Sequence, residues 1–293
     1  MIAQLINALV RAILAAVLVA LPALALPSAS QDGTQIVVLV ALVIALLVFL
    51  EYNSAYPSFI EFRYAPPINR LRFGAAFLTV AVLSAVCADP STTGTLAEIA
   101  ASLAGLAADV LDVPFSPVRL MVTMLPPDAP PDLVATLRDA AGFAYFMGMV
   151  IIAVFFVLVR VMGWPARTGA FNVWVNLPLF DPTAGRDVVT RLQRHGLIHL
   201  VLGFLLPFCF PAVSKLASDV VDPLVLTNSQ TLIWVVCLWA ILPASLMIRG
   251  MAMNRIAQLI LQKRQRAYAA AEAEEGADQT EAARRTAQNW QLV

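Results

Sequence analysis

The chain has 293 residues, of which 60% are hydrophobic and only 13% are charged. Soluble domains carry about 45–50% apolar and about 25% charged residues, so this composition excludes an ordinary water-soluble fold. Basic and acidic residues are equal in number, and the resulting net charge of zero argues against nucleic acid as a partner.

Long uncharged runs indicate an all-α, polytopic integral membrane helical bundle with about six transmembrane helices. Backbone groups in lipid must be satisfied within their own segment, and about 20 apolar residues of helix cross the hydrocarbon core. Within a membrane domain of residues 1–250, we expect spans near 12–31, 33–50, 73–88, 140–159, 195–214 and 223–248.

The first of these segments has an alternative interpretation. Arg11, the apolar run after it and the small residues at 28–30 resemble a secretory signal peptide with its cleavage site. We favour a retained helix, because the uncharged stretch is long for a signal peptide and the cleavage site matches poorly.

Basic residues predict the orientation. If the N-terminus is cytoplasmic, all but three of the nineteen basic residues lie on the cytoplasmic side, the exceptions being Arg119, Arg138 and Lys215. Cytoplasmic segments retain Lys and Arg, so both termini are expected inside. The cytoplasmic loops are then 51–72 and 160–194, and 89–139 is periplasmic. The Ala, Arg and Val bias is typical of GC-rich bacteria and favours a bacterial inner membrane.

The periplasmic loop contains one clear helical pattern. Ile99, Leu103, Leu106 and Val110 recur at helical spacing, which predicts an amphipathic helix on the outer membrane surface or across the end of the bundle. The run from Asp132 is expected to continue into the fourth span as one long helix.

The two cytoplasmic loops mix aromatic residues, prolines and arginines. One interpretation is a pair of interfacial loops anchored to lipid and to each other. The other is a surface that docks other membrane proteins, because aromatic residues and Arg are enriched in interface hot spots. The expected contact residues are Tyr56, Phe62, Arg63, Trp164, Trp174 and Phe180.

Residues 251–293 form a separate cytoplasmic tail. Met253, Ile256, Leu259 and Ile260 lie at helical spacing among basic residues, which predicts a juxtamembrane amphipathic helix suited to anionic lipid. A second short helix is expected after Gly276.

The chain has only two histidines, His195 and His199, and their spacing puts both rings on one helix face. They are candidate ligands for a metal, haem or pigment, with Asp181, Asp187, Glu51 and Glu61 as carboxylates on the same side of the membrane. A metal site needs more than two ligands, so the favoured interpretation is an interfacial pair without a cofactor.

Gly203, Pro207 and Pro211 fall at four-residue steps and predict a bent fifth span. Broken helices occur at transporter binding sites, so a transporter or channel for a small solute is one alternative function. However, no Asp, Glu or Lys lies in any expected span, which argues against ion-coupled transporters and proton pumps.

No Walker lysine loop, G-x-S-x-G or H-E-x-x-H motif is present, so we do not expect an enzyme. The favoured function is a non-catalytic accessory, assembly or scaffold component that contacts other membrane proteins through the aromatic and arginine-rich cytoplasmic loops. The alternatives are the transporter with its bent fifth span and a metal or redox protein that uses His195 and His199.

Overall fold

The computed structural model describes residues 2–26, 31–88, 90–165, 171–181, 185, 187–217 and 223–290, and every regular element in these ranges is helical. The α-helical prediction is therefore confirmed. The elements are α1 (Ile2–Ala25), α2 (Gln31–Asn53), α3 (Ile68–Val86), α4 (Pro90–Leu111), α5 (Pro117–Thr123), α6 (Pro131–Arg160), α7 (Val173–Asn176), α8 (Val188–Leu216), the 3₁₀ turn η2 (Pro223–Thr227) and α9 (Ser229–Trp290).

Seven of the described helices are long and apolar enough to cross a membrane, namely α1, α2, α3, α4, α6, α8 and α9. By helix length and hydropathy the chain is a multi-pass membrane protein. Six of the seven correspond to the expected spans, and α4 is an additional candidate.

Most of the helices extend beyond the expected spans, because hydropathy marks the section in hydrocarbon whereas backbone hydrogen bonding continues past it. α1 already begins at Ile2, and α3 begins at Ile68, so Arg70 and Arg72 belong to a helix and not to a loop. α6 starts at Pro131, as expected for one long helix. The last span starts later than expected, at Ser229, where Asn228 Oδ1 accepts a hydrogen bond from the Thr231 amide at 3.0 Å.

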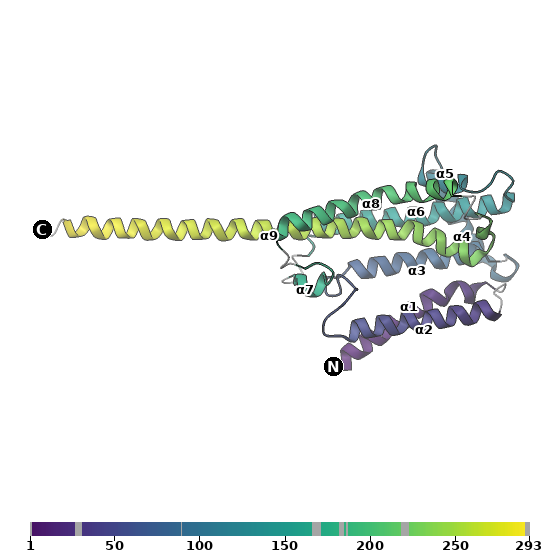
Figure 1. The fold of residues 1–293 in the computed structure, drawn as a ribbon, viewed down its shortest axis with the longest axis horizontal. Coiled ribbons are helices and arrows are strands. Elements are labelled where there is room, and N and C mark those ends of the chain that lie inside the picture. The colour runs from purple at the N-terminus through teal and green to yellow at the C-terminus, as the bar shows by residue number, and fades with distance from the viewer. Residues whose placement is uncertain are drawn as a thin grey trace.

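The first half of α9 forms the centre of the bundle, where α3, α6 and α8 pack against it (Figure 1). Its buried residues recur every three or four positions, from Ile233 to Ile248. Small residues allow α8 to approach closely: a Cβ added to Gly203 would lie 2.7 Å from the Pro243 carbonyl oxygen.

The bundle has two distinct ends. In Figure 1, α7 lies at one end, from which α9 projects, and α5 lies at the other; we refer to them as the α7 end and the α5 end. The α1–α2 hairpin stands at the edge of the bundle beside α3, and α2 packs mainly on α1.

α4 lies across the α5 end rather than along the bundle (Figure 1). It starts four residues after α3 ends, and Asp112, just beyond its other end, pairs with Arg138 in the early turns of α6 at 2.9 Å. The expected amphipathic helix is therefore present. Its face toward the bundle is a stripe of buried alanines, whereas its large apolar side chains are exposed; the latter are Leu96, Ile99, Leu103, Leu106 and Val110.

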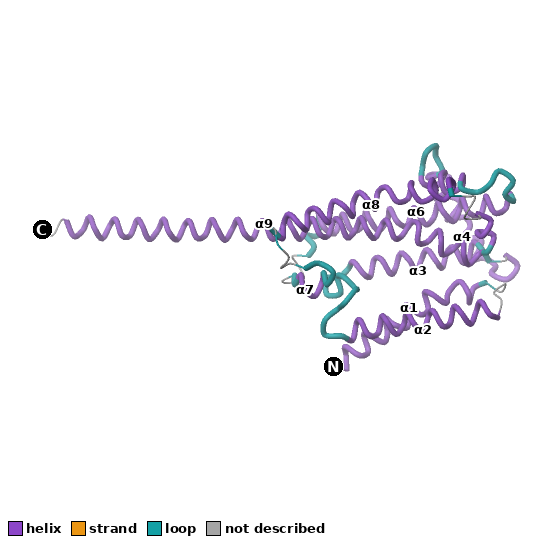
Figure 2. The backbone as a smooth tube through the Cα atoms, viewed as in Figure 1, coloured by secondary structure: helices purple, strands orange, loops and turns teal. Residues whose placement is uncertain are grey.

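The expected break near Gly276 is wrong, because α9 continues without interruption to Trp290 (Figure 2). One glycine costs about 1 kcal/mol in a helix, and the surrounding Ala, Glu, Gln and Arg residues offset it. The proposed lipid-facing residues Met253 and Ile256 are instead buried within the bundle, and the described side chains of α9 are continuously exposed from 261 to 280.

Candidate functional site

A buried ionic cluster at the α7 end joins the loop before α3 to α8 and α9. Arg249 of α9 donates from Nη2 to Glu61 Oε1 at 2.5 Å and from Nε to Glu61 Oε2. The two side chains are 18% and 7% exposed. A bidentate guanidinium–carboxylate pair fixes both distance and orientation, so it attaches the loop rigidly to the central helix.

His199 of α8 completes this cluster. Its Nε2 accepts a hydrogen bond from Arg249 Nη1, because a guanidinium N–H can only donate. Nδ1 must then carry the ring proton, and it donates to the His195 carbonyl oxygen at 2.6 Å. Both ring nitrogens of His199 are therefore occupied by protein groups.

The two histidines do not converge on a shared ligand position. The His195 ring is exposed and lies edge-on to Phe180, with 5.9 Å between ring centroids. Among the described residues, no group of three His, Cys, Asp or Glu side chains is placed to hold a metal ion. Of the four expected carboxylates, Glu61 does approach His199, but through Arg249. Metal or haem binding at His195 and His199 stays an alternative to the favoured interfacial pair without a cofactor.

A second polar arrangement fixes the loop that follows α2. Glu51 Oε1 accepts three successive backbone N–H groups, from Ser58, Phe59 and Ile60, at 2.6, 2.8 and 2.9 Å. A single carboxylate oxygen therefore satisfies three donors of an irregular segment, and Glu51 is only 4% exposed.

Arg63 closes the same loop from the other side. Its guanidinium donates to the backbone carbonyls of Glu51, Tyr52 and Ser54 at 2.6, 2.8 and 2.7 Å. The last carbonyls of a helix lack intrahelical donors, so Arg63 caps the C-terminus of α2.

The two expected cytoplasmic loops pack against each other through aromatic rings and backbone. The Trp164 ring lies 5.2 Å from that of Phe155 and 6.4 Å from that of Phe62. Phe62 has a φ of 56°, and its amide donates to the Asn176 carbonyl oxygen at 2.7 Å. The Asn176 side chain also accepts from the Tyr64 amide at 2.9 Å, so the two loops form one layer.

The expected partner-contact residues differ in how far their side chains are exposed. Tyr56 is 79% exposed and Arg63 is half-buried, whereas Phe62, Trp164 and Phe180 are buried in their own chain. The side chain of Trp174 lies outside the described residues. Their role in partner binding stays a prediction.

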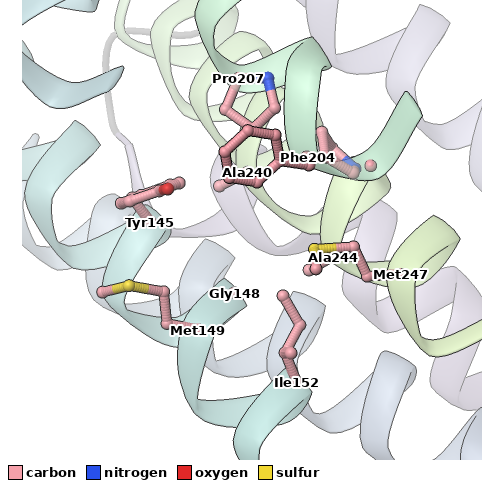
Figure 3. Close-up of a pocket in the computed structure, with 11 residues that line it drawn as sticks. Tyr145, Gly148, Met149, Ile152, Phe204, Pro207, Ala240, Ala244 and Met247 are labelled. Atoms are coloured by element: carbon pink, nitrogen blue, oxygen red, sulfur yellow. The ribbon is translucent and has the colours of Figure 1, made fainter. Parts of the chain in front are cut away.

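The region beside Gly203 and Pro207 bears on the transporter alternative. Figure 3 shows Tyr145, Met149 and Ile152 of α6 facing α8 and α9 around a crevice of about 40 Å³. That volume holds only a few water molecules. Pro211 lacks the N–H that would bond to the Pro207 carbonyl, and Trp239 Nε1 donates to that carbonyl instead, at 3.0 Å. Around this crevice the described side chains of α6, α8 and α9 pack closely and do not line a polar pathway.

Comparison with known proteins gives no match to this chain among family models, curated proteins or solved structures.

Proposed function

We propose that this protein is a non-catalytic accessory or scaffold component of a bacterial inner membrane, and that it contacts other proteins through the α7 end and the projecting part of α9. The observation that carries the proposal is the length of α9. The helix has 62 residues, and its side chains are exposed from 261 to 280.

The projecting segment has the properties of a docking arm. At about 1.5 Å per residue, residues 261–290 extend about 45 Å from the bundle. A helix that is polar on all sides has no core of its own to pack on, and most helices in proteins depend on packing for their stability. Its sequence changes from basic at 263–266 to acidic at 272–275, which gives a partner a distinctive charge pattern to recognise.

Charge distribution supports a cytoplasmic α7 end and an orientation with both termini inside. Two of the three basic residues at the opposite end are neutralised by acidic neighbours: Arg119 pairs with Asp112 at 2.7 Å, and Arg138 pairs with Asp109 at 2.7 Å. The third, Lys215, donates to the Leu125 carbonyl oxygen at 3.1 Å. Lys and Arg near the span ends set the orientation, and most of the described basic residues lie toward the α7 end, which supports that end as the cytoplasmic one.

The test is purification of the full chain from native membranes in mild detergent, followed by quantitative mass spectrometry. We expect a defined protein at constant stoichiometry with the wild type. Ala271→Pro breaks the projecting helix and should remove that protein, as should replacement of Glu272, Glu274 and Glu275 by Lys. Ala269→Ser is the matched control. A lone monomer, or a partner retained equally by all variants, would contradict the proposal.

A further inference from the structure

A cavity of about 650 Å³ lies between the α1–α2 hairpin and α3, near the α7 end. This volume is in the range of sites that hold organic ligands. The hairpin packs on the bundle through a limited contact of α1 with α3 and α9, so the cavity lies at the boundary between the hairpin and the main bundle.

Four arginines line this cavity: Arg11 of α1, Arg63 of the loop between α2 and α3, and Arg70 and Arg72 of α3. None of the residues that line it is an aspartate or glutamate. Two acidic side chains of the adjoining segment are engaged by other groups, Glu51 by three backbone amides and Glu61 by Arg249. The charged side chains that line the cavity are therefore all positive, and the nearby carboxylates of Glu51 and Glu61 stand outside its lining.

The arginines differ in what they already contact. Arg63 uses its N–H groups to cap α2, and the Arg11 guanidinium lies 4.4 Å above the Tyr52 ring. Arg72 donates from Nη2 to the Ser245 carbonyl oxygen at 2.8 Å, but its buried Nε has no acceptor among the described groups. A buried donor left unsatisfied is costly, which points to an acceptor that the described part of the chain does not supply.

The remaining wall of the cavity is apolar. Leu14 and Val48 contribute from the hairpin, and Phe73, Ala76 and Ile241 contribute from the bundle. A ligand that fits must therefore combine an anionic group with hydrocarbon. The helices on both sides are long and apolar enough to cross a membrane, so a lipid has access to the apolar wall from the hydrocarbon region.

We propose that this cavity binds an anionic glycerophospholipid, with its phosphate between the arginines and its acyl chains along the apolar wall. Basic pockets between membrane helices are suited to acidic headgroups. Guanidinium groups recognise phosphate oxygens through paired hydrogen bonds, and the phosphate supplies the acceptor that Arg72 Nε lacks. The lipid also fills the space between the hairpin and α3 and so holds the two together.

The experiment uses the full-length protein in mild detergent, with phosphatidylglycerol, phosphatidylcholine and inorganic phosphate as separate probes. Native mass spectrometry counts retained lipids, and thermal unfolding measures stabilisation by each probe. We expect phosphatidylglycerol to be retained and to stabilise at concentrations where phosphatidylcholine does neither. Inorganic phosphate, which lacks the hydrocarbon, should have little effect.

Substitutions assign the binding to the cavity. Arg11 and Arg70 are both exposed, so replacing them with Gln leaves the fold intact. Each lost arginine should weaken phosphatidylglycerol binding about fivefold, and the pair about 25-fold. The pair Arg11→Lys and Arg70→Lys should retain most of the binding. Lys263→Gln with Arg266→Gln removes two charges at the same end outside the cavity and should change nothing.

Three results would overturn the proposal. Equal retention of phosphatidylglycerol and phosphatidylcholine would exclude recognition of the charge. Wild-type affinity in the Arg11→Gln, Arg70→Gln protein would exclude this cavity. Stabilisation by inorganic phosphate alone at matching concentrations would identify a site for a free anion and not for a lipid.

Discussion

Glu61 and Arg249 are 188 positions apart in the sequence and form a bidentate ion pair that joins the loop before α3 to the central helix α9. Arg249 also donates to His199 of α8. Three separate segments thus meet at one guanidinium, and the packing of the α7 end depends on it.

Replacing Arg249 by Met should be among the most destabilising single changes in the protein. Removing one partner of a buried pair leaves the other charge uncompensated and costs about 3–5 kcal/mol. The double variant Glu61→Leu, Arg249→Met should be less destabilised than the sum of the two single changes. Denaturant unfolding in detergent measures both, with the exposed Arg266→Met as control. Additive losses would show that the two residues do not act as a pair.

The close contact between α8 and α9 predicts a strong size limit at Gly203. A side chain there would bring Cβ within 2.6 Å of Met247 Cγ and 2.7 Å of the Pro243 carbonyl oxygen, so backbone must shift. We expect Gly203→Val to lower the unfolding free energy by about 1–3 kcal/mol.

The matched control for Gly203 is Gly74 of α3, where an added Cβ meets nothing within 4 Å. Alanine favours a helix by about 1 kcal/mol over glycine, so Gly74→Ala should leave thermal stability equal or higher. A Gly203→Val protein as stable as Gly74→Ala would contradict the close packing of α8 on α9.

The sequence predicts the long helices well because hydropathy is a local property. The sequence does not predict the ion pair between Glu61 and Arg249, because charges in distant segments give no periodic signal. α4 is an intermediate case. Spacing predicts that Ile99, Leu103, Leu106 and Val110 share a face, but not that this face points outward. The buried alanines on the other face of α4 allow a closer approach to α6. Only the tertiary contacts show that the alanine face, and not the face with the large apolar side chains, packs on the bundle.

Glu51 should control the order of the loop after α2. Glu51→Ala removes the acceptor for the amides of Ser58, Phe59 and Ile60, whereas Glu51→Gln keeps an oxygen at the same place. Hydrogen exchange of these amides should accelerate about tenfold or more with Ala, corresponding to about 1.4 kcal/mol or more of lost protection. Gln should have a smaller effect. The Leu177 amide, bonded to the Val173 carbonyl, is the reference that should stay unchanged. Unaltered exchange at 58–60 would exclude the role of the carboxylate.

The contact between Asp187 and Arg264 makes the base of the projecting helix sensitive to pH only in strong acid. The hydrogen bond from Arg264 at 2.5 Å, helped by the Thr190 amide, lowers the pKa of Asp187 below its ordinary value of 3.8. Because the pKa of Asp187 is lowered in the folded state, the Asp187–Arg264 contact is fully present when the pH is above the ordinary pKa of an aspartate. The contact is lost only as the pH falls through the lowered pKa of the folded state. The mobility of a spin label at position 268 should therefore stay constant between about pH 5 and 7 and rise in stronger acid. Asp187→Asn should raise the mobility of this spin label already at neutral pH. A transition near pH 6 would contradict this assignment.

The position of α4 predicts which side of the membrane its flanks occupy. It has the length and hydropathy of a span, yet it starts four residues after α3 and ends beside the first turns of α6. Because α4 lies across the α5 end, we expect Tyr56 and Phe115 on opposite sides of the membrane; a helix α4 that crossed the bilayer would put them on the same side. Both side chains are highly exposed, at 79% and 86%. With the native cysteines replaced by Ser, Tyr56→Cys should react with an impermeant thiol reagent only from the cytoplasmic face and Phe115→Cys only from the other. Labelling of both from one face would make α4 a seventh span and reverse the orientation of every helix after it.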